Sequence, residues 1–177
     1  MDIRKIKAKR KELISDSNLE WREILDLSSD VQKDFNDNES LTIPLYNKIL
    51  DWKLSGQTAL LKKIRTGSPD SLIQTITHCY FKVDHPDDDM KTRIKVHVLL
   101  SIPWIGIGVA SAIMALHEPR IYAGIDSRTW AALFNEDKKT FSIKHYETYL
   151  SGIGDLADKV GCDVQEIGYI LWKQYEV

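Results

Sequence analysis

The sequence predicts an all-α protein, and three observations point to this class. Apolar residues recur at steps of three and four along most of the chain, which is the spacing of one helix face. No segment combines strict alternation with β-branched residues and flanking hairpin turns. The polar breaks are short, as in one packed helical unit. We therefore expect the 177 residues to form a compact bundle of roughly eight to ten helices.

Start and stop signals place these helices along the chain. Ser68 is expected to cap a helix with Pro69 in its first turn, because serine is a favoured N-cap and proline is tolerated there. Gly161 is expected to hinge the last two helices. The expected helices cover 18–32, 42–54, a segment from Ser68 onward, 91–102, 107–117, 142–160 and 163–175. Polar breaks are expected at 34–40, 82–90 and 134–140.

Composition excludes several classes of protein. Lys plus Arg is 24 and Asp plus Glu is 26, a net charge of −2, which excludes a histone-like binder that relies on bulk charge. There is no apolar run of membrane-spanning length, and the basic start lacks an apolar core, so neither a membrane partner nor a secretory signal is expected. The histidines and acids show no metal-ligand spacing, so we expect no metal and no cofactor.

Cysteine and tryptophan positions add expectations about the interior. Cys79 and Cys162 lie far apart without a CxxC pair, which predicts two buried free thiols and a cytoplasmic location. The tryptophans expected in the core, because they lie on apolar stripes, are Trp21, Trp52, Trp130 and Trp172.

Basic residues are concentrated in particular segments despite the near-zero net charge. Residues 40–65 hold five bases and one acid, and residues 91–97 hold three bases and no acid. This predicts a local basic face around 48–65 and 91–97, with ordinary solvated helix faces as the alternative. A polyanion could then be held at a few phosphates rather than by net charge.

The most informative stretch is 99–133, LLSIPWIGIGVASAIMALHEPRIYAGIDSRTWAAL. A helix reaches Pro103, a turn contains Gly106 and Gly108, and a second helix follows. The free amides at the start of such a helix point outward, and the helix dipole favours an anion there. The alternative is a helical hairpin without a ligand, since proline and glycine are the usual turn residues.

This stretch resembles the helix-hairpin-helix of the DNA glycosylase superfamily that includes endonuclease III and the adenine and 8-oxoguanine glycosylases. Pro103, Ile105, Gly106 and Ala110 match the hairpin pattern of that family, and the interval from Gly106 to Asp126 is also similar. The resemblance implies a compact glycosylase-like fold with a central helix-hairpin-helix at 91–117. It also implies a second lobe from 1–40 plus 141–177, within one unit spanning 1–177.

The resemblance assigns roles to particular residues. The expected contacts to the DNA backbone come from Trp104, Ile105, Gly106, Gly108 and Val109. Leu54-Ser-Gly-Gln57-Thr is similar to the segment whose glutamine fills the space left by a flipped base, so Gln57 is a candidate wedge. The alternative for that segment is a break between two helices at Gly56.

Asp126 is the expected catalytic residue. In the family this carboxylate faces the sugar of the flipped nucleotide and stabilises the positive charge that develops as the base departs. Asp126 is also well placed to cap the helix that follows it, and the two roles are compatible because a capping side chain can present its second oxygen to a ligand.

The chain departs from the family at three points. Trp104 occupies the position of the first hairpin glycine, Gly108 occupies the position of the Schiff-base lysine, and no cluster-binding cysteines follow. The expected function is therefore that of a monofunctional base-excision glycosylase acting on double-stranded DNA, hydrolysing the N-glycosidic bond of a flipped nucleotide without a lysine lyase step. The alternative is a non-catalytic helix-hairpin-helix module that binds DNA or another protein.

Overall fold

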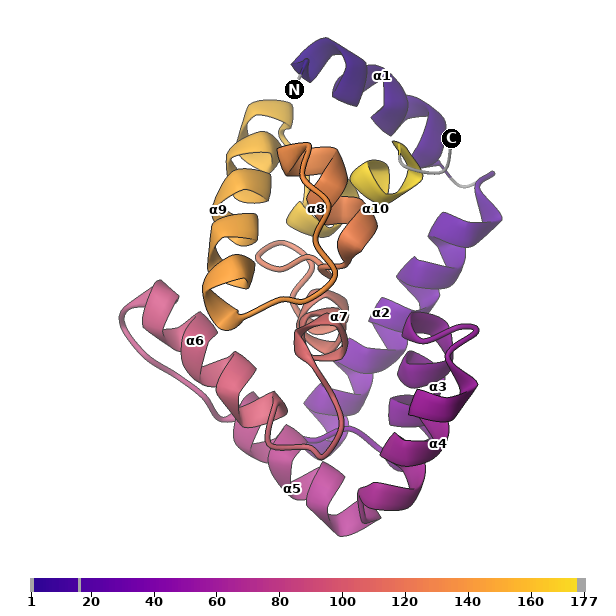
Figure 1. Cartoon of the computed structure of the whole chain (residues 1–177), viewed down its shortest axis with the longest axis vertical. Coiled ribbons are helices and arrows are strands. Elements are labelled where there is room, and N and C mark those ends of the chain that lie inside the picture. The colour runs from indigo at the N-terminus through magenta and orange to yellow at the C-terminus, as the bar shows by residue number, and fades with distance from the viewer. Residues whose placement is uncertain (1, 16, 175–177) are drawn as a thin grey trace.

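Helices account for all regular structure in the computed structural model, which describes residues 2–15 and 17–174 (Figure 1). These residues form ten α-helices and no strand, so the all-α prediction is confirmed. None of the described helices is long and apolar enough to cross a membrane. In chain order they are α1 (Ile3–Leu13), α2 (Leu19–Asn38), α3 (Ile43–Lys53), α4 (Thr58–Gly67), α5 (Asp70–Phe81), α6 (Asp88–Leu99), α7 (Ile107–His117), α8 (Ser127–Phe134), α9 (Ile143–Val160) and α10 (Val164–Gln174).

Helix α7 lies in the middle of the arrangement (Figure 1). It contacts α2, α3 and α6, and its side chains are buried around the whole circumference, as expected for a helix that is apolar on every face. Helices α8, α9 and α10 pack against one another, and α1 packs against α9 and α10. The residues that follow α7 and lead into α8 are consequently held between the central helix and this second group.

Helix α2 is longer than predicted, since most of the polar break expected at 34–40 is helical. The helix continues to Asn38 and ends at Glu39, which has a left-handed φ of 54°. Phe35 explains the extension: its ring is fully buried and stacks on Phe81 at 5.7 Å between ring centroids. A single buried aromatic thus outweighs the polar residues around it.

Two helix starts also differ from the prediction. The N-cap of α5 is Pro69, not Ser68, whose hydroxyl instead donates to the carbonyl of Pro103 at 3.4 Å. The acidic loop expected at 82–90 is shorter, because α6 begins at Asp88 with Asp87 as its N-cap. Acidic side chains in the first turn of a helix interact favourably with the positive end of the helix dipole, which is why this acidic run is partly helical.

The thiols and two of the tryptophans are less buried than predicted. Cys79 is exposed and Cys162 is half-buried, and both are free. Trp21 and Trp130 are in the core as expected, whereas Trp52 and Trp172 are only partly buried, because they line a cleft. Apolar spacing predicts which side of a helix is apolar, but it does not predict that part of that side lines a cleft.

A charged cluster lies partly buried where α6 and the end of α7 meet. Lys95 has a side chain that is 4% exposed, and its Nζ pairs with Glu118 while lying 5.2 Å from the ring centroid of Tyr80. Burial by itself would raise the pKa of Glu118, but contacts with His117 and Lys95 outweigh it and lower that pKa to about 2. Tyr80 completes the cluster through its hydroxyl, which lies 3.0 Å from His117 Nδ1.

Candidate active site

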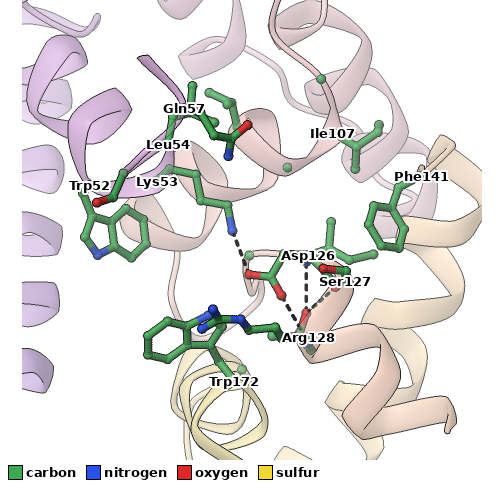
Figure 2. A pocket seen from close by; sticks show the side chains of 18 of the residues that line it. Trp52, Lys53, Leu54, Gln57, Ile107, Asp126, Ser127, Arg128, Phe141 and Trp172 are labelled. Atoms are coloured by element: carbon green, nitrogen blue, oxygen red, sulfur yellow. Dashed lines mark hydrogen bonds and ion pairs between the residues drawn. The ribbon is translucent and has the colours of Figure 1, made fainter. Parts of the chain in front are cut away.

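A cleft of about 860 Å³ brings together segments that are far apart in the sequence (Figure 2). The end of α3 and the turn after it form one wall, and the start of α7 and the residues before α8 form another. Helix α10 closes a third side. Asp126, Gln57, Gly106, Gly108 and Val109 all line this cleft, so it holds most of the residues singled out from the sequence.

Asp126 caps α8 and also faces the cleft. Its Oδ1 accepts a hydrogen bond from the Thr129 amide at 2.9 Å, and the Asp126 amide donates to Thr129 Oγ1 at 3.0 Å, which completes a capping box. Its Oδ2 lies 3.4 Å from Lys53 Nζ. One carboxylate oxygen therefore fixes the side chain, and the other faces Lys53 in the cleft.

Lys53 is the main residue that sequence analysis missed. Its side chain extends from the last turn of α3 towards Asp126, as Figure 2 shows, and is 15% exposed. Side chains added at Gly108 or Gly124 would approach it, since a Cβ on Gly108 would lie 4.0 Å from Lys53 Cε and one on Gly124 would lie 3.7 Å from Lys53 Nζ. No local pattern marks Lys53, because its partner is 73 positions away.

The backbone at the start of α7 offers free donors. Gly106 is the N-cap, without a side-chain cap. Among the described residues, the amides of Gly106, Ile107 and Gly108 find no acceptor. The amide of Ile105 donates to Ile102 and that of Val109 to Gly106, so these two predicted contact residues have no backbone donor to spare. Any anion held here would be bound by the amides of 106–108.

Gln57 lies at the start of α4, on the cleft wall opposite Asp126 (Figure 2). Its side chain is exposed and makes no capping hydrogen bond. Gly56 turns the chain here with a left-handed φ of 82°, a conformation that glycine adopts without steric cost. The segment therefore does contain a break between two helices at Gly56, and it also exposes Gln57 to the cleft.

Trp104 and Ile105 lie outside the cleft. Trp104 adopts φ 68°, the left-handed region that suits the glycine expected at this place. Its indole packs on the end of α4, where a Cβ on Gly67 would come within 2.6 Å of Nε1, yet 61% of the residue remains exposed. Lys63 Nζ lies 5.6 Å from the ring centroid. Ile105 is buried.

The cleft also has aromatic and cationic walls. Arg128 follows Asp126 by two positions, and its guanidinium lies 5.3 Å from the ring centroid of Trp172 (Figure 2). Trp52 and Phe141 contribute further apolar surface. Flat aromatic walls beside polar groups suit a planar ligand with polar edges, such as a nucleobase.

The basic face predicted around 91–97 is paired with acids. Lys91 pairs with Asp84, Arg93 with Glu147, and Lys95 with Glu118. Within 48–65, Lys48 pairs with Asp30 and Arg65 with Asp51, whereas Lys63 lies over Trp104. Most of the bases in these two segments are therefore paired with acids, which come from α2, α3, α9 and the residues beside α6 and α7.

Ser111 connects the central helix to the segment that carries Asp126. It is fully buried, accepts from the Ile125 amide at 3.0 Å and donates to the Gly108 carbonyl at 3.1 Å. We expect Ser111→Ala to lower the free energy of unfolding by about 1–3 kcal/mol, because a buried amide loses its acceptor. Urea unfolding should show this. Ser101→Ala, at an exposed serine just after α6 whose hydroxyl bonds only to the carbonyl of His97, should change the free energy of unfolding by less than about 0.5 kcal/mol. Equal losses in the two variants would contradict the role of Ser111.

Comparisons with known proteins give no match: no protein-family model, curated protein or solved structure corresponds to this chain. Among residues 2–15 and 17–174, no group of three or more His, Cys, Asp or Glu side chains could hold a metal ion.

Proposed function

We propose that this protein is a DNA glycosylase that binds double-stranded DNA and cleaves the N-glycosidic bond of a flipped damaged or modified nucleotide. The observation that carries the proposal is the single cleft shared by Asp126, the free amides of 106–108 and Gln57. Each supplies one of the parts that base excision from a duplex needs: a carboxylate, a phosphate anchor and a side chain to replace the lost base.

The carboxylate suits the chemical step. As the base departs, positive charge develops on the sugar, and an anion held in place lowers the energy of that state. Asp126 is held by its capping box and needs no rearrangement before reaction. The aromatic side chains at Trp52, Phe141 and Trp172 give the flipped base a surface on which to stack.

The test is base release from a panel of duplexes carrying uracil, 8-oxoguanine, alkylated bases or bulky modified bases. Alkali treatment after incubation converts each abasic product into a cleaved strand. We expect strand cleavage after alkali for at least one duplex. No abasic product on any of them would remove the catalytic part of the proposal.

Affinity for a charged abasic analogue separates this proposal from its alternative. A glycosylase should bind a duplex with a cationic abasic analogue at least about 100-fold tighter than plain duplex, because the analogue resembles the transition state. Fluorescence anisotropy at two salt concentrations measures both affinities. Equal, salt-dependent binding of the two would instead indicate a non-catalytic DNA-binding module, which the exposed indole of Trp104 at the turn favours.

A further inference from the structure

Helix α1 is the most strongly charged of the described helices, with six bases and one acid. Arg10 pairs with Glu166 of α10 at 2.5 Å, and Lys9 Nζ lies 3.4 Å from Glu12 of the same helix. The other four bases are exposed and have no acid within ion-pair distance among residues 2–15 and 17–174; they are Arg4, Lys5, Lys7 and Lys11. In this α1 differs from the segments 48–65 and 91–97, where most bases are paired.

Three of these unpaired bases share one face of α1. Arg4, Lys7 and Lys11 are separated by three and four positions, so their side chains follow one another along the helix. The row is about 10 Å long, because an α-helix rises about 1.5 Å per residue. One strand of a DNA duplex places a phosphate about every 3.4 Å along the axis. The row therefore has the sign of charge and the length to contact about three phosphates of one strand.

Helix α1 is held against one wall of the cleft. It packs on α10, the helix that closes one side of the cleft, and on α9 (Figure 1). Asn18 Nδ2 donates to the Leu13 carbonyl at 2.7 Å and to the Tyr169 hydroxyl at 3.2 Å, and Tyr169 itself lines the cleft. These bonds and the Arg10–Glu166 pair fix α1 on α10. A duplex bound at the cleft is long enough to extend over a helix packed on its wall.

The exposed positions of α1 suit a nucleic acid better than a lipid surface. They carry no apolar residue larger than Ala8. Ile6 is fully buried and Leu13 packs against the core, so the apolar side of the helix is already covered by protein. Helices that lie on membranes insert large apolar side chains, and α1 has none left to insert.

We propose that α1 is a second DNA-contact surface, in which Arg4, Lys7 and Lys11 hold phosphates of the duplex beside the cleft. The inference rests on the proposed function for its ligand, double-stranded DNA, and assigns that ligand a surface outside the cleft. Contacts to phosphates carry no sequence information, so α1 adds affinity and does not select the base. A chain with a net charge of −2 thus has a local cationic surface for a polyanion.

The salt dependence of DNA affinity tests this surface. Each phosphate contact contributes about 0.9 to the slope of log affinity against log salt concentration. We expect Arg4→Gln/Lys7→Gln/Lys11→Gln to reduce the magnitude of that slope by about 2–3, and to weaken binding of plain duplex at about 0.1 M salt at least about 10-fold. Fluorescence anisotropy with the full-length protein measures both, and circular dichroism checks that the helix content is unchanged.

A matched control removes the same charge elsewhere. Lys33→Gln/Lys82→Gln/Lys144→Gln changes three exposed lysines, on α2, after α5 and on α9, none of which lines the cleft. This variant should keep the slope and the affinity of the wild type. An equal fall in both variants would show that only net charge matters, and would overturn the role of α1.

Acetylation of the wild-type protein gives a second readout that needs no substitution. Mass spectrometry follows the acetylation of each lysine with and without a saturating amount of duplex. Lys7 and Lys11 should react at least about 5-fold more slowly in the complex, because bound phosphates cover their amines. Lys33 and Lys144 should react at the same rate in both samples. Absence of protection at Lys7 and Lys11 would contradict the contact.

The outcomes separate this inference from the proposed function. Base release together with an unchanged slope in the α1 variant overturns the role of α1 and leaves the glycosylase proposal standing. A reduced slope without base release from any duplex leaves the α1 surface standing on a non-catalytic DNA-binding protein. No salt-dependent binding of duplex by the wild type overturns both. Loss of binding to phosphatidylserine vesicles by the α1 variant, with duplex affinity unchanged, would replace DNA by an anionic lipid surface.

Discussion

Replacing Asp126 by Asn is expected to lower the rate of base release by about 100- to 1,000-fold while leaving the fold in place. Asparagine caps helices about as well as aspartate, so the bond to the Thr129 amide persists. What disappears is the negative charge on the oxygen that faces Lys53 and the cleft. Losing one fixed electrostatic group at a reacting centre usually costs two to three orders of magnitude in rate.

Single-turnover base release measures the rate, and a thermal melt measures the fold. Asp126→Ala serves as the matched control, because it also removes the cap and should cost about 1 kcal/mol of stability beyond that of Asp126→Asn. If Asp126→Asn releases base at the wild-type rate, the carboxylate is a helix cap only.

Replacing Lys95 by Met should produce the largest change in stability, about 3–5 kcal/mol. The substitution leaves the half-buried Glu118 carboxylate without its ammonium partner, and removing one member of a pair that is largely withdrawn from water is costly. For a chain of this length the loss corresponds to a fall in the melting temperature of roughly 10 °C. The double variant Lys95→Met/Glu118→Met should regain much of it, because no unpaired charge remains. Equal stability of Lys95→Met and wild type would show that the pair contributes nothing.

The same pair gives stability a defined dependence on pH. The pKa of Glu118 in the folded protein is about 2, below the ordinary value of 4.5. A lowered pKa means that the carboxylate stabilises the fold fully above pH 4.5, and that this contribution, about 3 kcal/mol, is lost as the pH falls towards 2. Urea unfolding between pH 7 and 3 should show a steeper decline for the wild type than for Glu118→Gln.

Features that depend on neighbouring residues could be predicted from the sequence. Asp126 and Thr129 lie three positions apart, so their capping box is visible in the chain itself. The all-α class follows in the same way from side-chain spacing over single helices. The positive φ of Trp104 could not be predicted from the residue type, but its place in a glycine-bearing turn indicated that a bulky residue would have to adopt an unusual backbone conformation there.

Features that depend on packing could not be predicted. Lys53 meets Asp126 because α3 and the segment before α8 both lie against α7. The acids that pair with Arg93 and Lys95 come from α9 and from the residue after α7. Which charges meet is decided by how helices cross, and helical spacing says which face is buried but not what covers it.

The cleft wall formed by α10 has a consequence for biosynthesis. Tyr169 and Trp172 are among the last described residues, whereas Lys53 and Asp126 emerge from the ribosome much earlier. A nascent chain thus carries both of these side chains before the α10 side of the cleft exists. The cleft is therefore complete only once α10 has been made, and a copy that stops before Val164 would lack the wall that Tyr169 and Trp172 form.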